Sequence, residues 1–204
     1  MRAGGVLPGD TNGLYGQAGD TASCDTRSLI SNLGAEAAEW ATALGITSAD
    51  IPTFVASLSP VLLRADTTVT NHGYTDGELT TYPAVLQAGT AVLVDSHGEP
   101  TVKCFSGNPL SKAPDISQAA TIGSAWSGYT PQTVTIVQPT PQVVERRTVI
   151  DIHNRRPVIR VVQPTPSRTP GPIPTPGSTR NPNRRSTRTS RPSPTNLRWT
   201  RPRR

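Results

Sequence analysis

The chain of 204 residues is poor in aromatic side chains, with 3 Trp, 4 Tyr and 2 Phe, and it has only two cysteines. It lacks any run of about 18 consecutive apolar residues, so the sequence predicts no transmembrane segment. The first residues do not form the apolar core of a secretory signal. This favours a cytoplasmic protein, or a start that has lost its export signal or anchor. A core with few aromatic rings has a small stability margin, so a cross-link in it would be valuable.

The signatures of common catalytic and nucleotide-binding sites are missing as well. No GxSxG, Walker, GxGxxG, HExxH or EF-hand pattern occurs. The three histidines, His72, His97 and His153, are far apart in sequence, and neither cysteine has the CxxC neighbour typical of a zinc site. The sequence therefore predicts no metal and no cofactor. It favours a protein that is not an enzyme, while leaving that question open.

Acidic residues are absent from the last part of the chain. Residues 1–162 hold all 14 acidic residues and 10 basic ones, a net charge of −4, whereas residues 163–204 hold ten arginines, no acid and ten of the 21 prolines. Such a segment cannot bury enough apolar surface to fold, so we predict a disordered basic tail over 163–204. A chain ending at Val162 is then expected to melt within a few degrees of the full chain.

The tail accounts for the net charge of +6 and the isoelectric point near 10. Arginine presents a planar fork of donors suited to phosphate and carboxylate groups, so the tail arginines are candidate polyanion-binding residues. They are Arg180, Arg184, Arg185, Arg188, Arg191, Arg198, Arg201, Arg203 and Arg204.

The rest of the sequence predicts one small α+β domain over 24–162, after an irregular lead-in over 1–23. Apolar residues at helical spacing predict helices over 25–33, 35–44 and 48–58. Asp25 or Thr26 is the candidate N-cap of the first and Ser48 that of the third, and Gly45 ends the second. Short β-branched runs predict strands over 61–64, 67–70, 91–95, 101–105, 133–137, 147–152 and 158–162. We expect the N-terminal helices to pack on a mostly antiparallel sheet.

Two strand ends repeat the same residues. The strands over 133–137 and 158–162 both run into Val-Gln-Pro-Thr-Pro, which favours two edge strands that leave the same sheet. Residues 95–100 are typical of a hairpin connection. Their Ser-His-Gly resembles the Ser-His-Gly-Cys run of L,D-transpeptidases, but Glu99 stands where the nucleophilic cysteine would be, so we exclude that chemistry.

Four polar residues are candidate binding residues: Asp66, Asn71, His72 and Asn108. Asp66 and His72 are candidates for a ligand or proton-transfer pair, but we favour a capped turn between two strands at Asn71-His72-Gly73. A nucleophilic pair of Cys104 and His72 would require a free thiolate at Cys104.

The two cysteines, Cys24 and Cys104, either form a disulfide or remain two buried thiols, depending on the redox compartment. A disulfide would close a loop of about 80 residues and stabilise the fold by roughly 4–5 kcal/mol. We favour the disulfide on the condition that the protein is exported.

A combination of short motifs resembles a known family. The motifs are Cys24-Asp25, Asp66-Thr67, the runs 69–73, 86–95, 102–104 and 107–110 with Gly98, and Trp126-Ser127-Gly128-Tyr129. Together, over about residues 12–152, they are similar to an actinobacterial cell-envelope domain of unknown function, carried on lipoproteins or membrane-anchored proteins. The resemblance implies export and a disulfide-permissive setting. It implies no activity, and therefore no catalytic residue.

Three functions are compatible with these observations. The first is a non-enzymatic extracytoplasmic binding or scaffolding domain, whose tail binds anionic cell-wall or membrane polymers or acts only as a spacer. The second is nucleic-acid binding through the same arginines, with strong salt dependence. The third is an unrecognised hydrolase or transferase that uses the region of Asp66 and His72. We favour the first, located in the cell envelope. The sequence leaves the ligand and the oligomeric state undetermined.

Overall fold

The computed structural model describes most of the chain. The described residues are 4–19, 24–75, 78–114, 120–122, 124–168 and 196–200. The helices are α1 (Thr26–Asn32), α2 (Ala37–Ala43) and α3 (Ile51–Ser57), with short 3-10 segments at Gly34–Glu36, Ser48–Asp50 and Pro131–Thr133. The strands are β1 (Gly5–Pro8), β2 (Tyr15–Gln17), β3 (Ser59–Leu63), β4 (Thr67–Thr75), β5 (Glu78–Leu86), β6 (Ala91–Val94), β7 (Pro100–Lys103), β8 (Leu110–Ser111), β9 (Ala120–Ile122), β10 (Thr135–Gln138), β11 (Arg146–Asp151), β12 (Pro157–Val161) and β13 (Asn196–Thr200).

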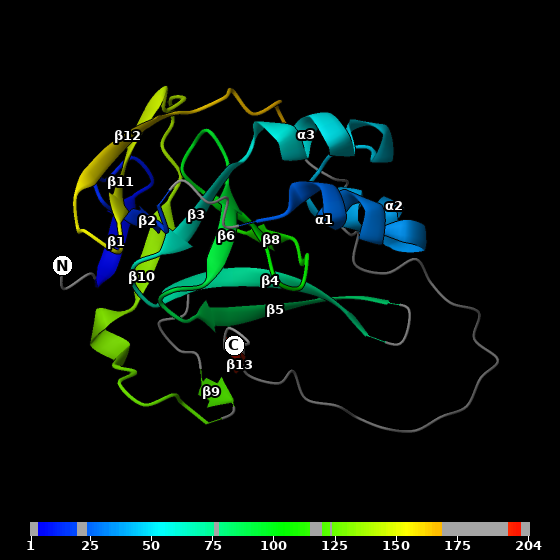
Figure 1. Ribbon diagram of the computed structural model, residues 1–204. Coiled ribbons are helices and arrows are strands. Elements are labelled where there is room, and N and C mark those ends of the chain that lie inside the picture. The colour runs from blue at the N-terminus through cyan, green and yellow to red at the C-terminus, as the bar shows by residue number, and fades with distance from the viewer. Residues whose placement is uncertain are drawn as a thin grey trace, which may run out of the picture.

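The strands form two mixed sheets (Figure 1). The first has the order β1-β10-β4-β5-β13-β9, with β8 also paired to β4, and the second has the order β12-β11-β2-β3-β6-β7. The longest pairing is antiparallel, between β4 and β5, and runs from Thr67–Leu86 to Thr75–Glu78. Both sheets also contain parallel pairs, such as β1 with β10 and β2 with β11. The mixture of helices and sheet is confirmed, but two mixed sheets take the place of the single, mostly antiparallel one that we expected.

Successive side chains of β6 point to opposite faces of the second sheet and pack in two different apolar clusters. Val92 and Val94 contribute to a cluster that also holds Val69 and Leu86 of the first sheet, so this core lies between the sheets. Leu93 lies between these valines and therefore faces the other way, where it packs in a second cluster with Phe54 of α3. The second sheet is thus covered on both faces around β6.

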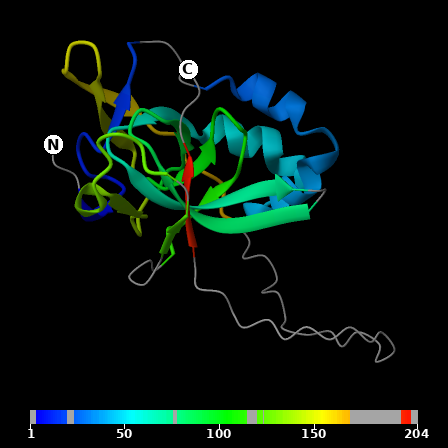
Figure 2. The same cartoon turned by 90° about the horizontal axis from the view of Figure 1, so that it is seen from below.

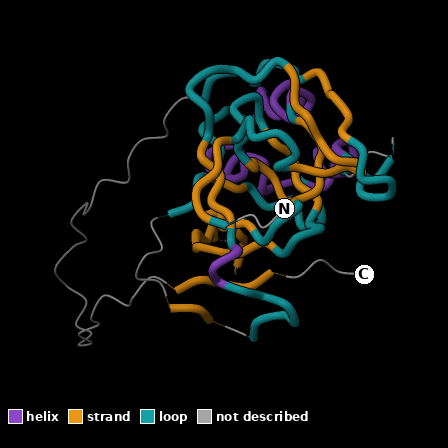
Figure 3. Tube along the Cα trace, turned by 90° about the vertical axis from the view of Figure 1, so that its left-hand side faces the viewer, coloured by secondary structure: helices purple, strands orange, loops and turns teal. Residues whose placement is uncertain are grey.

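The three helices lie together over this second face (Figures 1 and 3), and the 3-10 segment Pro131–Thr133 lies apart from them. Helix α3 buries Ile51, Phe54 and Val55, the i, i+3, i+4 spacing of an amphipathic helix. The helices form close to the predicted ranges because the apolar period agrees with them. Asp25 caps α1, and Thr47 with Asp50 forms a capping box just before α3. They do not lead the chain, however, since β1 and β2 precede them.

Several predicted details are wrong. Residues 1–23 are not simply an irregular lead-in, because β1 pairs with β10 and β2 lies inside the second sheet, between β11 and β3. The two repeated strand ends do not leave one sheet: β10 lies inside the first sheet and β12 is an edge strand of the second. The hairpin connection over 95–100 is confirmed by the antiparallel pairing of β6 with β7.

The part of the tail next to the domain is held against it. Thr165 and Ser96 exchange two hydrogen bonds, each from a backbone N–H to the other's hydroxyl, at 2.9 and 3.0 Å. Arg168 forms an ion pair with Asp95 at 2.8 Å and lies over the ring of Phe54. Further on, β13 pairs in parallel with β5 and β9 (Figure 2). The tail residues 163–168 and 196–200 therefore contact the domain, and the rest of the predicted disordered tail lies outside the described residues.

These contacts reverse the expectation for a shortened chain. We expect a chain ending at Val162 to be less stable than one ending at Arg168 by about 2–4 kcal/mol, because it loses the two Thr165–Ser96 hydrogen bonds and the charge-assisted bonds from Arg168 to Asp95 and Thr101. The melting temperatures should differ by roughly 5–15 °C. Both chains lack β13, so the comparison isolates residues 163–168. Equal melting temperatures would show that these contacts contribute nothing.

Candidate functional site

A cleft of about 320 Å³ lies between helices α1 and α2, the distal half of the β4–β5 hairpin and the loop that follows β7. Clefts of this size accommodate small ligands or single side chains of a larger partner. The first helix contributes Leu29 and Asn32, the hairpin contributes His72 and Tyr74, and the loop contributes residues 104–109. Three segments that are distant in sequence therefore share one site.

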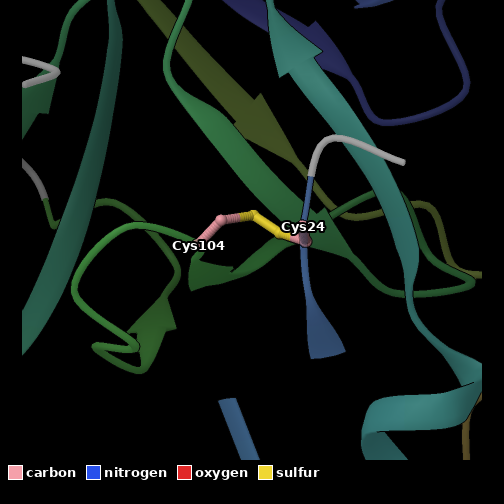
Figure 4. Close-up of a disulfide and its surroundings, with 2 residues drawn as sticks. All are labelled: Cys24 and Cys104. Atoms are coloured by element: carbon pink, nitrogen blue, oxygen red, sulfur yellow. A yellow bond between two sulfur atoms is a disulfide. The ribbon is translucent and has the colours of Figure 1, made fainter. Parts of the chain in front are cut away.

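Two long-range contacts hold the walls of the cleft together. The predicted disulfide between Cys24 and Cys104 is confirmed, with a Cα–Cα distance of 5.3 Å, and it joins the start of α1 to the loop after β7 (Figure 4). Trp40 of α2 is buried, and its indole N–H donates to the carbonyl oxygen of Gly107 at 2.8 Å. Because the loop is attached to both helices, the cleft is formed before any ligand arrives.

The carboxylate of Asp25 organises the first turn of α1. It accepts hydrogen bonds from the backbone N–H groups of Arg27 and Ser28 and from the Ser28 hydroxyl. The hydrogen bond from the Ser28 hydroxyl group is the main reason why the pKa of Asp25 lies below its ordinary value. Asp25 therefore carries its negative charge at the rim of the cleft over the whole neutral pH range.

His72 lies in the wall formed by the hairpin. Its ring Nδ1 lies 3.1 Å from the hydroxyl oxygen of Thr81 and its Nε2 lies 2.9 Å from that of Ser111. Burial lowers the pKa of His72, so the imidazole is neutral at neutral pH. With both ring nitrogens engaged by hydroxyl groups, His72 joins β4, β5 and β8 and is not poised as a general base.

The structure brings three of the four candidate binding residues together. Asn71, which is buried, accepts a hydrogen bond at 3.4 Å from the amide of Asn108, and His72 follows it in β4. Asp66 lies elsewhere: its carboxylate accepts the backbone N–H of Ala88 at 2.8 Å. Six residues of extended chain separate it from His72, roughly 20 Å, so the two form no proton-transfer pair.

The turn predicted at Asn71-His72-Gly73 is wrong, because β4 continues through these residues to Thr75. Polar residues and a glycine resembled a turn, but cross-strand pairing with β5 determines the backbone here. The pair of Cys104 and His72 is likewise excluded as a nucleophile and base, since Cys104 is part of the disulfide.

Residues 5–163 match the family described as Domain of unknown function (DUF6777). The chain belongs to this family. The match spans the helices and every described strand except β13, and it ends where the arginine-rich residues begin. No curated protein and no solved structure matches the chain significantly. The cleft of the DUF6777 domain must therefore be interpreted from its own residues.

A second polar cluster in the DUF6777 domain is structural. The buried carboxylate of Asp95 accepts the backbone N–H groups of His97 and Glu99, and its main-chain oxygen accepts a hydrogen bond from Arg147. Burial raises the pKa of Glu99. The Ser-His-Gly residues in this turn carry hydrogen bonds to the chain around Thr140 and Thr165.

Glycine is required in the same turn. Gly98 has a φ of +81°, and a Cβ there would collide with the backbone of Gly9. The hydroxyl of Tyr15 donates to the Gly98 carbonyl oxygen at 2.7 Å, and the Arg147 guanidinium lies over the Tyr15 ring. This cluster therefore connects β2, β6, β7 and β11 of the DUF6777 domain.

Sequence reasoning missed the cleft residues Asp25, Glu36, Trp40 and Phe105. Phe105 carried the one usable signal, as an aromatic residue directly after a cysteine in a loop rich in Gly, Asn and Pro. Of the predicted polyanion-binding arginines, Arg198 lies in β13, and the others are outside the described residues.

Two further findings bear on the setting of the DUF6777 domain. Within the described ranges, no helix is long and apolar enough to cross a membrane, and no three His, Cys, Asp or Glu side chains gather as a metal site would require. The disulfide indicates an oxidising, extracytoplasmic compartment, because such bonds are rare where thiols are kept reduced.

Proposed function

We propose that this protein is a non-enzymatic binding or scaffolding domain of the cell envelope, whose arginine-rich segment binds anionic envelope polymers. The observation that carries this proposal is the cleft, which is pre-formed by the disulfide and the Trp40 contact. Its histidine is held neutral between two hydroxyl groups, and its cysteine is oxidised. An arrangement of this kind suits recognition better than acid–base or nucleophilic chemistry.

The charge distribution supports the second half of the proposal. Ten arginines and no acid follow residue 162, whereas the residues before it carry a net charge of −4. The similarity of the motifs to an actinobacterial envelope domain on lipoproteins and membrane-anchored proteins supports the same location. In an oxidising compartment, phosphate- and carboxylate-bearing wall polymers are the polyanions that guanidinium groups would meet first.

The test is the salt dependence of polymer binding by the full chain. We expect affinity for a phosphodiester wall polymer to fall steeply as salt rises, because bound counterions are released. Substituting glutamine for Arg180, Arg184, Arg185, Arg188 and Arg191 should flatten this dependence and weaken binding at least tenfold, while leaving β13 intact.

The matched control replaces the same five arginines with lysine, which keeps the charge and should retain most of the binding. A neutral polysaccharide of similar length should not bind. Binding that is insensitive to salt, or that survives the glutamine substitutions, would contradict the proposal. Stronger binding to duplex DNA than to the wall polymer would favour a nucleic-acid function instead.

A further inference from the structure

We propose that the cleft binds the cationic side chain of a lysine- or arginine-containing peptide. This ligand is opposite in charge to the polymer proposed for the arginine-rich segment. The inference concerns the folded domain alone and goes beyond the proposed function.

The charges that line the cleft are all negative. Asp25 and Glu36 are among the lining residues, and no lysine or arginine in the described part of the chain joins them. Glu36 is exposed, and its side-chain carboxylate forms no hydrogen bond or ion pair with any residue that the structure describes. A rim of this kind attracts a cation and repels phosphate or carboxylate groups.

Other charged or titratable groups near the rim do not neutralise it. Arg27 acts on Asp25 but is the smallest of the causes that shift the pKa of that carboxyl group. His72 supplies no compensating positive charge, because burial lowers its pKa. The pKa of Tyr74, in the hairpin wall, is raised first by burial and then by the charges of Glu39 and Glu36, so the negative field of these carboxylates reaches the aromatic ring.

Aromatic side chains complete the site. Phe105 is 65% exposed at the loop, and Tyr74 lies in the hairpin wall. The face of an aromatic ring attracts an ammonium or guanidinium group, and combining such faces with a free carboxylate is a common way to bind a cationic side chain. An exposed phenylalanine next to a disulfide has no role in the core, and cation recognition accounts for it.

A peptide also brings carbonyl groups, and an unused donor lies beside the cleft. Asn71 is 1% exposed, and its side-chain N–H group has no partner among the described residues. Its carbonyl oxygen accepts only the long hydrogen bond from Asn108, which lines the cleft. Because the Asn71 N–H group is shielded from solvent, a ligand carbonyl would approach this amide pair from the Asn108 side, where that amide lines the cleft.

The experiment titrates the full chain with four blocked amino acids, followed by NMR or calorimetry. They are the N-acetyl methylamides of lysine, arginine, norleucine and glutamate. We expect the two cationic compounds to bind at millimolar or lower concentration, norleucine to bind at least fivefold more weakly than lysine, and glutamate not to bind. Glu36→Gln should weaken lysine binding about three- to tenfold, and Phe105→Ala about two- to fivefold.

Two matched controls separate the cleft from general charge and surface effects. Glu145→Gln makes the same change in net charge at an exposed site outside the cleft, and Ile159→Ala removes an equally exposed apolar side chain. Neither should change binding. The inference is overturned if neither cationic compound binds, if glutamate binds as well as lysine, or if Glu145→Gln weakens binding as much as Glu36→Gln does.

The proposal for the arginine-rich segment and the proposal for the cleft can each be contradicted without contradicting the other. The variant with glutamines in the arginine-rich segment should keep its binding of the lysine compound, and Glu36→Gln should keep its binding of the wall polymer. Stronger binding of the lysine compound by the glutamine variant would show that the chain's own arginines compete for the cleft, which also supports a cationic ligand.

Discussion

Replacing Cys24 and Cys104 together with alanine is expected to lower the free energy of unfolding by about 4.5 kcal/mol, the chain-entropy value for a separation of 80 residues. The melting temperature should fall by roughly 10–18 °C. The effect is large because the bond closes most of the N-terminal half into one loop and ties α1 to the sheet. Thermal or urea unfolding of the wild-type and double-variant proteins measures it.

A reducing agent supplies the control for this prediction. It should destabilise the wild-type protein by a similar amount and leave the double variant unchanged. Each single substitution should cost about as much as the double, because either one removes the bond. A double variant with the same melting temperature as the oxidised wild-type protein would contradict the prediction. It would also remove the basis for a pre-formed cleft.

Asp95→Asn is expected to cost about 3–5 kcal/mol, as is typical when one member of a buried charged group is removed. The substituted side chain would keep the shape of the aspartate, and its carbonyl oxygen could still accept the two backbone N–H groups that Oδ1 accepts. Its amide NH2 group would take the place of Oδ2, so a donor without negative charge would face the Arg168 guanidinium. The buried guanidinium of Arg147, which already has nitrogens without partners among the described residues, would also lose a nearby negative charge. Urea unfolding measures the loss.

The control for Asp95→Asn is Asp10→Asn, which changes the same functional group at an exposed position and should alter stability by less than about 0.5 kcal/mol. Combining Asp95→Asn with Arg168→Met should cost less than the sum of the two single changes, because the pair is already broken by either one. Additive costs would show that Asp95 and Arg168 do not act as a pair.

The helices could be predicted from the sequence because their signals are local. The apolar spacing of Ile51, Phe54 and Val55 and the cap at Asp25 act within one or two turns, and the structure shows helices there. Strands β6 and β7, on either side of Gly98, were also predicted correctly, from local runs of β-branched residues. The strands of the first 23 residues were missed because short Gly-containing segments become strands only through partners elsewhere in the chain. β5 was missed because Pro83 interrupts a run that otherwise favours a strand.

The candidate site, too, could be predicted only in part from the sequence. His72 and Asn108 could be selected from sequence because polar residues stand out in short apolar segments, but the pairing of Asn108 with Asn71 could not. Glu36 carries no distinctive sequence signal, and Phe105 only its position after a cysteine. Both become cleft residues because the disulfide and the Trp40 contact bring the helices to the loop.

Residue type and order alone predict the helices, most of the strands, the two possible disulfide partners and the concentration of positive charge at the end of the chain. These depend on spacing and composition, which act over short distances. Four features could be seen only in the folded chain: the two-sheet arrangement, the continuation of β4 through His72, the docking of Arg168 on Asp95 and the cleft. Each of these joins segments that are far apart along the chain, and long-range packing and hydrogen bonding override local preference there.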